Sequence, residues 1–403
     1  MRRRELFNIK KTGTLKLSAS SGTAAASSGS YVTFTVKYND VALTDENVVI
    51  SSTQTWVTKT WTASTSTVKL SCTSNTDLNN SRSAIITVTY DGASASYTLY
   101  QSKGTLSLSS YSASGNYKSG STTFNIQINN SNYSGTATVS SNQTWATTSK
   151  SGSTVTVSYT ENDSGNSRSA TITVTCQSKT QTFTFTQGRI MIITSLPYDG
   201  TINGYKYITI NNVKWAINNV GATSDGDGGL FFQWGDTQGY TAAQIGSGSG
   251  KKYFAWPDYK YGDGTSSPTG NSFTKYNPID NKTTLDSSDD AATVNMGSSW
   301  RTPTYSELSA LGNAIIDVGK FNSIYGSVFT DSNNSSKFLF IPWAGKANAG
   351  AVYNNNTSGS YWTSTLRSDS DKKTARIGLM ILTPNLTSGE LRYMGDRVRA
   401  ISS

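Results

Sequence analysis

A ten-residue stretch that occurs twice restricts the fold of this chain more than any other feature. Residues 80–89 read NSRSAIITVT, and residues 166–175 read NSRSATITVT. The preceding segments repeat as well, because SSTQTW ends at Trp56 and SSNQTW ends at Trp145. A Ser/Thr-rich composition does not by itself keep such motifs in one order and at similar spacing. The repeat therefore indicates two copies of one domain.

Further landmarks set the limits of the two copies. An arginine and a glutamine are 19 residues apart in both, at Arg82 and Gln101 and again at Arg168 and Gln187. The copies open with GTLKLS and GTLSLS. The predicted domain ranges are 13–102 and 103–188.

Apolar and polar side chains alternate within each repeated stretch, with the two-residue period of a β-strand. The apolar positions of the second copy are Ala170, Ile172, Val174 and Cys176. In the first copy the stretch runs into Asp91 and Gly92, a pair that favours a tight hairpin turn because both residues tolerate a positive φ. About seven such short strands per copy, without a helical period, predict an antiparallel, immunoglobulin-like β-sandwich.

The composition excludes several kinds of site. No run of eighteen apolar residues occurs, so we predict no membrane span. The chain has no His, and its two cysteines, Cys72 and Cys176, lie at non-equivalent positions of the repeat. Imidazole or thiolate metal sites and His-dependent catalysis are therefore excluded. We predict no bound metal and no cofactor.

The N-terminal segment is strongly basic. Residues 1–16 contain one acidic residue, Glu5. The basic residues of positions 1–12 are Arg2, Arg3, Arg4, Lys10 and Lys11. Such an arm is typical of docking on an acidic partner, with a solvated tail as the alternative. Aromatic residues that could stack on bases are not interleaved with it, which argues against nucleic acid. An apolar signal region is also absent, so we expect no general secretory export.

The character of the sequence changes near residue 190. All seven prolines lie at or after Pro197. We predict a linker at 189–202 and an α+β domain at 203–403. The most helical segment has Thr304 and Glu307 at the spacing of a capping box. Its apolar face is expected to contain Leu308, Leu311 and Ile315.

Five ordered motifs of the second half resemble a paralogous domain common in Bacteroidetes proteins. They are WAINNVGATS, FFQWGDT, KTTLDSSDDAATVNMGSSWRTPTYSEL, YWTST and RVRAI. The resemblance implies a C-type-lectin-like fold, related to formylglycine-generating enzymes and phage tropism determinants. The activity of those enzymes uses cysteines, and none follows Cys176, so that activity is not implied. The motif residues expected in the core are Trp300, Trp343 and Trp362.

The two predicted sandwiches resemble BACON domains. The shared features are the inner tryptophan, the N-x-R-x-A-x-I-x-V strand and the closing F-T-Q. That family is associated with carbohydrate or mucin binding, and many of its members are regarded as spacers. Trp56 and Trp145 are expected in the sandwich cores, whereas Trp61 lacks a counterpart in the second copy and is a candidate for an exposed ligand contact.

Several carboxylates are candidate metal ligands or catalytic groups. Asp286, Asp289 and Asp290 could gather around a cation, as could Asp225 and Asp227, but turn formation is the simpler interpretation. The sugar-binding triplets EPN, QPD and WND of calcium lectins are absent. Asp236, Asp258 and Asp263 lie in aromatic-rich loops, and no spacing among them identifies the acid–base pair that glycoside cleavage requires. We predict no catalytic residues.

One polar loop combines an aromatic side chain with several amides, a mixture that suits sugar or protein surfaces. It contains Tyr353, Asn354, Asn355 and Asn356. Related tropism domains bind through late surface positions, and this resemblance adds Arg367 and Tyr393 to the predicted ligand-binding residues. A plain solvated loop is the alternative.

The order of the domains resembles a virion fibre, and we expect a non-enzymatic structural protein of a tailed phage of a Bacteroidetes host, such as a crAss-like phage. The basic arm would bind capsid or tail proteins, and the other domains would bind host-surface or mucin glycans or proteins, as a head fibre or tail fibre. Fibres of this kind are generally homotrimers, although no heptad repeat enforces a trimer here. The alternatives are a cellular surface adhesin of a Bacteroidetes bacterium and a glycan-active enzyme.

Overall fold

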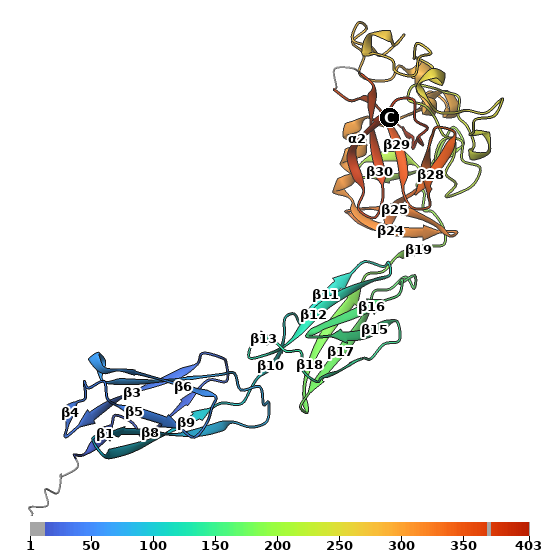
Figure 1. The fold of residues 1–403 in the computed structure, drawn as a ribbon. Helices are drawn as coiled ribbons and strands as arrows, with labels where there is room; N and C mark the ends of the chain where they lie inside the picture. Colours follow the sequence, from blue (N-terminus) through green and yellow to red (C-terminus); the bar gives the residue numbers. More distant parts are fainter. Residues whose placement is uncertain (1–12, 369–371, 403) are drawn as a thin grey trace, which may run out of the picture. The chain divides into compact units, whose positions relative to one another are not determined.

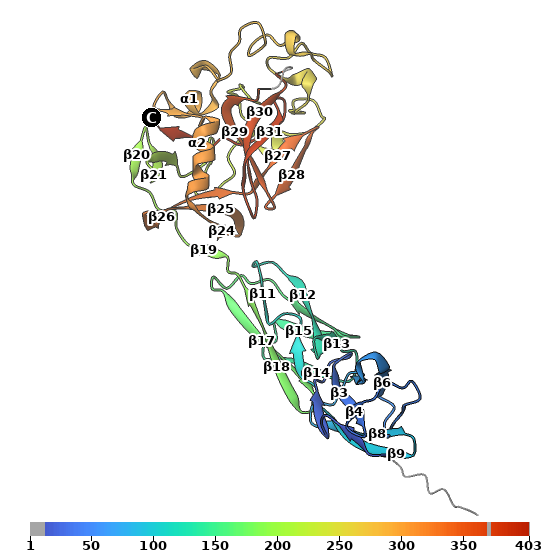
Figure 2. The ribbon, with the colours of Figure 1, turned by 90° about the vertical axis from the view of Figure 1, so that its left-hand side faces the viewer.

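The computed structural model describes residues 13–368 and 372–402 (Figure 1, Figure 2). The chain forms two compact units: the first ends at Gly188 and the second begins at Arg189, except that Asp163–Asn166 belong to the second. Among the described residues, no helix has both the length and the apolar character needed to cross a membrane. The predicted docking residues, Arg2, Arg3, Arg4, Lys10 and Lys11, lie outside the described residues.

The first copy of the repeat folds as two facing sheets. One sheet has the order β1-β3-β7-β6, with β4 paired to β3, and the other has the order β2-β9-β8-β5. The strands of the first sheet are β1 (Leu15–Leu17), β3 (Tyr31–Tyr38), β7 (Thr67–Cys72), β6 (Val57–Thr62) and β4 (Val41–Ala42), and the turn η1 is Ala63–Thr65. Those of the second are β2 (Ser21–Ala24), β9 (Ala93–Gln101), β8 (Arg82–Tyr90) and β5 (Val49–Ser52).

The second copy repeats this topology strand for strand. Its sheets have the orders β10-β12-β16-β15, with β13 paired to β12, and β11-β18-β17-β14. The first sheet contains β10 (Leu106–Leu108), β12 (Gly120–Ile128), β16 (Thr154–Tyr159), β15 (Ala146–Ser151) and β13 (Ser131–Asn132). The second contains β11 (Ser112–Gly115), β18 (Lys179–Gln187), β17 (Arg168–Cys176) and β14 (Thr138–Ser141). The protein is therefore mainly β, with two immunoglobulin-like sandwiches, as predicted.

The apolar residues that alternate with polar ones in the sequence are the residues that point into the core. The inward residues of β17 (Ala170, Ile172, Val174 and Cys176) are buried, and so are Phe183 and Phe185 on the returning strand β18. Asp91 and Gly92 both have positive φ, as the predicted hairpin turn requires. One prediction is only partly right, because each sandwich contains one parallel pair: β2 with β9, and β11 with β18. The chain crosses to the other sheet after β1 and after β10, and the next strand, β2 or β11, joins that sheet at its edge.

The repeated arginine, glutamine and tryptophan form one structural cluster. Arg82 and Gln101 are cross-strand partners in β8 and β9, and Arg82 Nε donates to Gln101 Oε1 at 2.7 Å. Arg82 Nη2 donates to the carbonyl oxygen of Thr73 at 2.8 Å, and Gln101 Nε2 donates to the same oxygen at 2.9 Å. The pair thus satisfies backbone groups between the two sheets.

The second copy has the same cluster. Arg168 and Gln187 are partners in β17 and β18, with Nε donating to Oε1 at 2.9 Å. Arg168 also covers Trp145, with its guanidinium carbon 4.2 Å from the ring centroid. Trp56 and Trp145 were expected inside the cores. Both are half-buried and lie at the core edges under these arginines.

The second unit is an α+β fold built on three sheets (Figure 2). Their orders are β19-β24-β25-β26, β20-β21-β22-β32-β23 and β28-β27-β29-β30-β31. The first sheet contains β19 (Met191–Ile193), β24 (Ile315–Phe321), β25 (Ile324–Asp331) and β26 (Asn334–Pro342). The second contains β20 (Gly200–Ile202), β21 (Tyr205–Ile210), β22 (Val213–Ala216), β32 (Ile401–Ser402) and β23 (Trp300–Arg301). The third contains β28 (Ala351–Asn355), β27 (Ala344–Asn348), β29 (Gly359–Leu366), β30 (Thr374–Met380) and β31 (Asn385–Leu391).

Long loops and short helices fill the remainder of this unit. The helices are α1 (Ala291–Met296) and α2 (Tyr305–Ala310). The 3-10 turns are η2 (Ala242–Gln244), η3 (Trp256–Asp258), η4 (Gly270–Ser272), η5 (Ser287–Asp289) and η6 (Leu311–Asn313). Trp300, Trp343 and Trp362 are buried, as predicted. Residues 189–202, predicted as a linker, instead contribute β19 and β20 to two sheets of the unit.

The predicted capping box is present, but the helix that it begins is short. Thr304 caps α2 and accepts from the backbone N–H of Glu307, whose side chain returns to Thr304. Leu308 and Leu311 are buried as predicted. Ile315 was expected on the same helical face, yet it is 59 % exposed at the start of β24. The α-helix ends at Ala310, and the 3-10 turn η6 that follows contains Gly312, a poor helix former.

Candidate functional site

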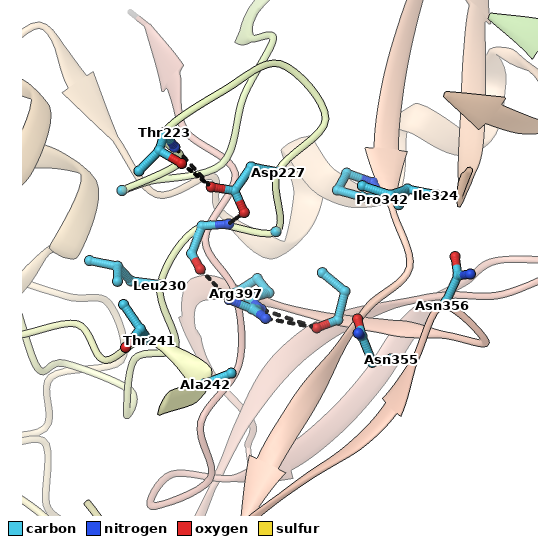
Figure 3. Close-up of a pocket in the computed structure, with 14 residues that line it drawn as sticks. Thr223, Asp227, Leu230, Thr241, Ala242, Ile324, Pro342, Asn355, Asn356 and Arg397 are labelled. Carbon is cyan, nitrogen blue, oxygen red and sulfur yellow. Dashed lines mark hydrogen bonds between the residues drawn. The ribbon is translucent and has the colours of Figure 1, made fainter. Parts of the chain in front are cut away.

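The second unit contains an open cavity with a volume of about 470 Å³. A glycine-rich loop, residues 221–230, forms one wall, and Asn355 and Asn356 at the end of β28 form another (Figure 3). Arg397 lies between them, and Thr241 and Ala242 also contribute. A volume of this size falls in the range of pockets that hold small ligands.

The glycine-rich loop is held by the carboxylate of Asp227. Its Oδ2 accepts from the backbone N–H of Thr223 at 2.8 Å and from the hydroxyl of Thr223 at 3.0 Å. Its Oδ1 accepts from the N–H of Gly229 at 3.2 Å. Burial alone would raise the pKa of Asp227, but these hydrogen bonds and the charge of Arg397 keep it below its usual value. The carboxylate is therefore charged at neutral pH and engaged with its own loop.

Two glycines let this loop approach its neighbours. Gly229 has a φ of +71°, which side chains disfavour. At Gly228, a Cβ would lie 2.8 Å from the Cβ of Ala344 and 3.2 Å from Nη2 of Arg397. A larger residue at 228 would push into the space that Arg397 and the cavity occupy.

Arg397 is buried at the base of the cavity, with only 6 % of its surface exposed. Its Nε and Nη2 donate to the carbonyl oxygen of Ala344 at 3.2 and 2.9 Å, and Nη1 donates to the carbonyl oxygen of Gly229. The guanidinium lies against the ring of Phe231, with its carbon 3.2 Å from the ring centroid. Figure 3 shows the side chain between the glycine-rich loop and the strands that carry Pro342 and Asn355.

Two predicted ligand-binding residues lie on the opposite wall. Asn355 pairs with Ala344 across β28 and β27, and its amide makes no hydrogen bond to another described residue. Asn356 has a φ of +62°, and its Oδ1 accepts from the backbone N–H of Tyr325 at 2.7 Å. This bond fixes the turn after β28 and leaves Asn355 at the cavity wall.

The other predicted ligand-binding residues are not on the cavity wall. Tyr353 is 46 % exposed on the edge strand β28, and Asn354 forms the following turn. Arg367 covers Gly389 on β31, at the opposite edge of the same sheet from β28. Tyr393 is half-buried and packs edge-on against Trp256, with ring centroids 4.8 Å apart. The loop, Arg367 and Tyr393, which were predicted to form one ligand-binding surface, therefore lie in separate places.

Trp61 was predicted as an exposed ligand contact, and its position contradicts this. The side chain is half-buried against the core of the first sandwich. Its indole N–H donates to the carbonyl oxygen of Asp45 at 2.9 Å. The second copy has Lys150 at the equivalent cross-strand position, and Lys150 Nζ donates to the carbonyl oxygen of Gly135 at 3.0 Å. Each side chain binds the equivalent loop of its own sandwich, between β4 and β5 or between β13 and β14, so the role is structural.

The acidic residues considered as metal ligands have partners within the protein. Asp290 caps α1 and accepts from the backbone N–H of Thr302. Asp289 pairs with Lys275 and accepts from the hydroxyl of Tyr276 at 2.7 Å, and these donors help to lower the pKa of Asp289 to about 2. Asp286 pairs with two lysines. Among residues 13–368 and 372–402, no group of three His, Cys, Asp or Glu side chains is arranged to hold a metal ion.

The acidic residues considered as catalytic groups also stabilise loops. Asp258 accepts from the backbone N–H groups of Phe254 and Ala255 at 3.0 and 2.8 Å. Asp263 accepts from Thr265, and Asp236 accepts from the N–H of Gln238 at 3.2 Å. None of these three lines the cavity.

Sequence reasoning missed Arg397. The segment RVRAI was recognised as a closing motif of the domain, but its arginines were not assigned a role. Alternation with Val398 and Ala400 places Arg397 on the opposite face of the segment, which is ordinarily the solvent face, so the sequence did not signal its burial. Its partners, Gly229 and Ala344, could not be identified before the chain was folded.

Comparisons with known proteins agree with the reading of the repeats. Residues 46–102 and 135–188 match the BACON family, described as a putative binding domain, N-terminal. No curated protein matches the chain.

Three solved structures with similarity to this chain share little sequence with it. A crystal structure of titin domains is 9 % identical, covering 50 % of this chain and 72 % of that one with a TM-score of 0.30. An endo-fucoidan hydrolase of glycoside hydrolase family 107 is 14 % identical, with a TM-score of 0.28 over 45 % of this chain. This chain spans 29 % of that enzyme. A protein from Bacteroides thetaiotaomicron solved by NMR is 18 % identical, covering 21 % of this chain and 86 % of that one with a TM-score of 0.18.

Proposed function

We propose that this is a non-enzymatic binding protein that holds a host-surface or mucin glycan in the cavity between the glycine-rich loop and Asn355. The observation that carries the proposal is the cavity lining, in which an unpaired amide, hydroxyl groups and a buried guanidinium converge on one open space of about 470 Å³. Amides, hydroxyls and arginine are the groups that bind sugar hydroxyls and polar substituents. The BACON match of both sandwiches, to a putative binding domain, points in the same direction.

The lining favours binding over catalysis. Asp227 is the one carboxylate among the described lining residues, and its oxygens already accept three hydrogen bonds. Glycoside cleavage by the usual mechanism uses two carboxyl groups about 5 to 10 Å apart. A glycan-active enzyme remains the alternative, and it would need a second carboxyl group from outside this cavity.

The finer proposal is a virion fibre of a tailed phage of a Bacteroidetes host, as a head or tail fibre. The basic segment 1–12 would dock on capsid or tail proteins, the two sandwiches would act as spacers or weak glycan binders, and the C-type-lectin-like second unit would be the adhesive head. Assembly as a homotrimer would multiply weak contacts, since linked sites raise avidity without new chemistry. The rival is a cellular surface adhesin of a Bacteroidetes bacterium.

Binding to a glycan array tests the coarser proposal. We expect the full chain to bind a subset of host-surface or mucin glycans, and Asn355→Ala to weaken that binding several-fold. Asn333→Ala, in the exposed turn between β25 and β26, is the matched control and should bind like the unmodified chain. Absence of binding to every glycan would overturn the proposal, whereas release of free sugar from an array glycan would favour the enzyme.

Pull-down against assembled virions and against host cells tests the finer proposal. We expect the full chain to bind both, and a chain lacking residues 1–12 to lose virion binding while keeping cell binding. A full chain that ignores virions but binds cells would place the cellular adhesin first.

A further inference from the structure

The guanidinium of Arg397 is a buried positive charge without an ion-pair partner among the described residues. Burial lowers the pKa of Arg397 to about 10, so the group is still a cation at neutral pH. A buried charge is unfavourable unless it is paired or fully hydrogen-bonded. The folded protein therefore buries the positive charge of Arg397 and stabilises it only in part.

The hydrogen bonds of Arg397 leave part of its donor capacity unused. A guanidinium has five N–H donors in a planar fork. Three of them donate to the carbonyl oxygens of Ala344 and Gly229. Because Arg397 lines the cavity, the remaining N–H groups can reach a ligand there. Carbonyl oxygens are neutral acceptors, so an anionic ligand would add the charge-assisted bonds that are stronger than these.

The neighbouring acidic groups act on Arg397 through their charge but make no hydrogen bond to it. Asp227 lines the same cavity, and its oxygens are engaged by Thr223 and Gly229 rather than by Arg397. Asp396, the preceding residue, is fully buried, and neither of its oxygens has a hydrogen-bond partner. Burial raises the pKa of Asp396 to about 8, so this carboxyl is mostly neutral at pH 7. Lys346, whose charge acts to lower the pKa of Asp396, is already paired with Glu390 at 2.7 Å.

We infer that the cavity takes an acidic sugar, whose anionic group binds the free edge of the Arg397 guanidinium. This inference rests on the proposed glycan-binding function and names the class of glycan. Carboxylate and sulfate substituents share the required chemistry, because both present anionic oxygens to a planar donor fork. The ring hydroxyls of the same sugar would contact Asn355 on one wall and Thr241 on the other.

Gly228 makes this approach possible. A Cβ at that position would lie 3.2 Å from Nη2 and 3.3 Å from the guanidinium carbon of Arg397. With hydrogen alone at Gly228, no side chain from that position covers Nη2, while Phe231 covers the face of the guanidinium. The aromatic ring shields the cation from solvent without neutralising it.

The test measures binding of the full chain to paired glycans that differ only in charge. The probes are glucuronic acid and 6-sulfated N-acetylglucosamine displayed on a common carrier, with glucose and N-acetylglucosamine as their neutral counterparts. We expect at least one acidic member to bind roughly tenfold or more tightly than its neutral counterpart, and higher salt to weaken it. Comparison of the carboxylated probe with the sulfated probe shows which anionic group the cavity prefers.

Substitution of Arg397 itself risks misfolding, because its donors also hold two backbone carbonyls. The informative variant is Asn355→Asp, which adds a negative charge at an exposed residue of the cavity wall. We expect it to weaken acidic-glycan binding roughly tenfold, by charge repulsion across the cavity, with an unchanged melting temperature. Asn334→Asp, an exposed residue at the far end of β26 from Pro342, adds the same charge elsewhere and should have little effect.

The outcomes separate this inference from the function on which it rests. Equal binding of acidic and neutral members, with Asn355→Asp and Asn334→Asp alike, would overturn the acidic-sugar inference and leave glycan binding standing. If the wider array of host-surface and mucin glycans also shows no binding, the proposed function fails and the inference fails with it.

Discussion

The guanidinium carbon of Arg82 lies 4.4 Å from the centroid of the Trp56 ring, and the same side chain donates to Gln101 on the adjacent strand. The second sandwich repeats this relationship between Arg168 and Trp145. The arginine therefore joins a half-buried indole, a cross-strand glutamine and the backbone of the facing sheet. This is the physical reason why the three residue types recur at fixed spacing in the two copies.

Arg82→Lys should loosen the first sandwich. A lysine ammonium cannot donate in a fork to Gln101 and Thr73 while covering an indole. We expect the free energy of unfolding of this sandwich to fall by about 2 kcal/mol. Hydrogen exchange of peptides from β8 and β9 measures the effect, and faster exchange should be confined to the first sandwich. Arg189→Lys, at an exposed arginine, is the control. Unchanged exchange in β8 and β9 would contradict a structural role of the cluster.

Stability of the second unit should decrease as the pH rises from about 4 to about 8. The pKa of Asp396 is raised to about 8 in the folded protein, chiefly by burial and also by Glu390, whereas Lys346 and Arg397 act to lower it. An unfolded Asp has a pKa of about 3.9. Between these values the folded state binds more protons than the unfolded state, so the free energy of unfolding falls with rising pH. Thermal unfolding of the full chain at pH 5, 6, 7 and 8 measures this decrease.

Asp396→Asn is the matching variant for the pH measurement. It keeps the shape of the side chain and cannot ionise, so the melting temperature of the second unit should vary less between pH 5 and 8. The chain contains no His, which removes the side chain that ordinarily titrates in this range. An equally steep pH dependence in the variant would assign the effect to another group.

Gly228→Ala should reduce ligand binding without preventing folding. The backbone of Gly228 is not in the left-handed region, but the new Cβ would lie 2.8 Å from the Cβ of Ala344. Relief of this contact requires a shift of Ala344 or of the loop, next to the guanidinium of Arg397. We expect glycan affinity to fall several-fold, as measured by array binding, and calorimetry to show a lower melting temperature with folding retained. Gly248→Ala, whose Cβ would meet only Lys251 at 3.9 Å, should bind normally.

Trp61→Phe should affect stability and leave glycan binding unchanged. The substitution removes the indole N–H that donates to the Asp45 carbonyl, at a cost of about 1 kcal/mol to the first sandwich. Thermal unfolding and array binding of the same variant separate the two effects. A loss of glycan binding at unchanged stability would restore the original interpretation of Trp61 as a ligand contact.

Much of the sandwich architecture is predictable from local patterns. Alternation along residues 166–175 determines which side chains face the core, because successive side chains of a strand point to opposite faces. The capping box of Thr304 and Glu307 is similarly local, since its partners are three residues apart. The parallel pairing of β2 with β9 is not local. It depends on where the chain crosses from one sheet to the other, and the alternation of apolar and polar residues does not indicate that position.

The cavity was decided by the tertiary structure. Asn355 could be proposed from sequence, because an aromatic residue and several amides in a polar loop favour surface recognition. Its assignment to a cavity wall required the pairing of β27 with β28, and the role of Arg397 required the glycine-rich loop around Gly228 to lie beside it. These residues are far apart in the chain, so no short-range period relates them. The sequence by itself determined the repeated sandwiches and the helix start, whereas long-range tertiary contacts of strands and loops brought a buried cation, a glycine and an amide to one site.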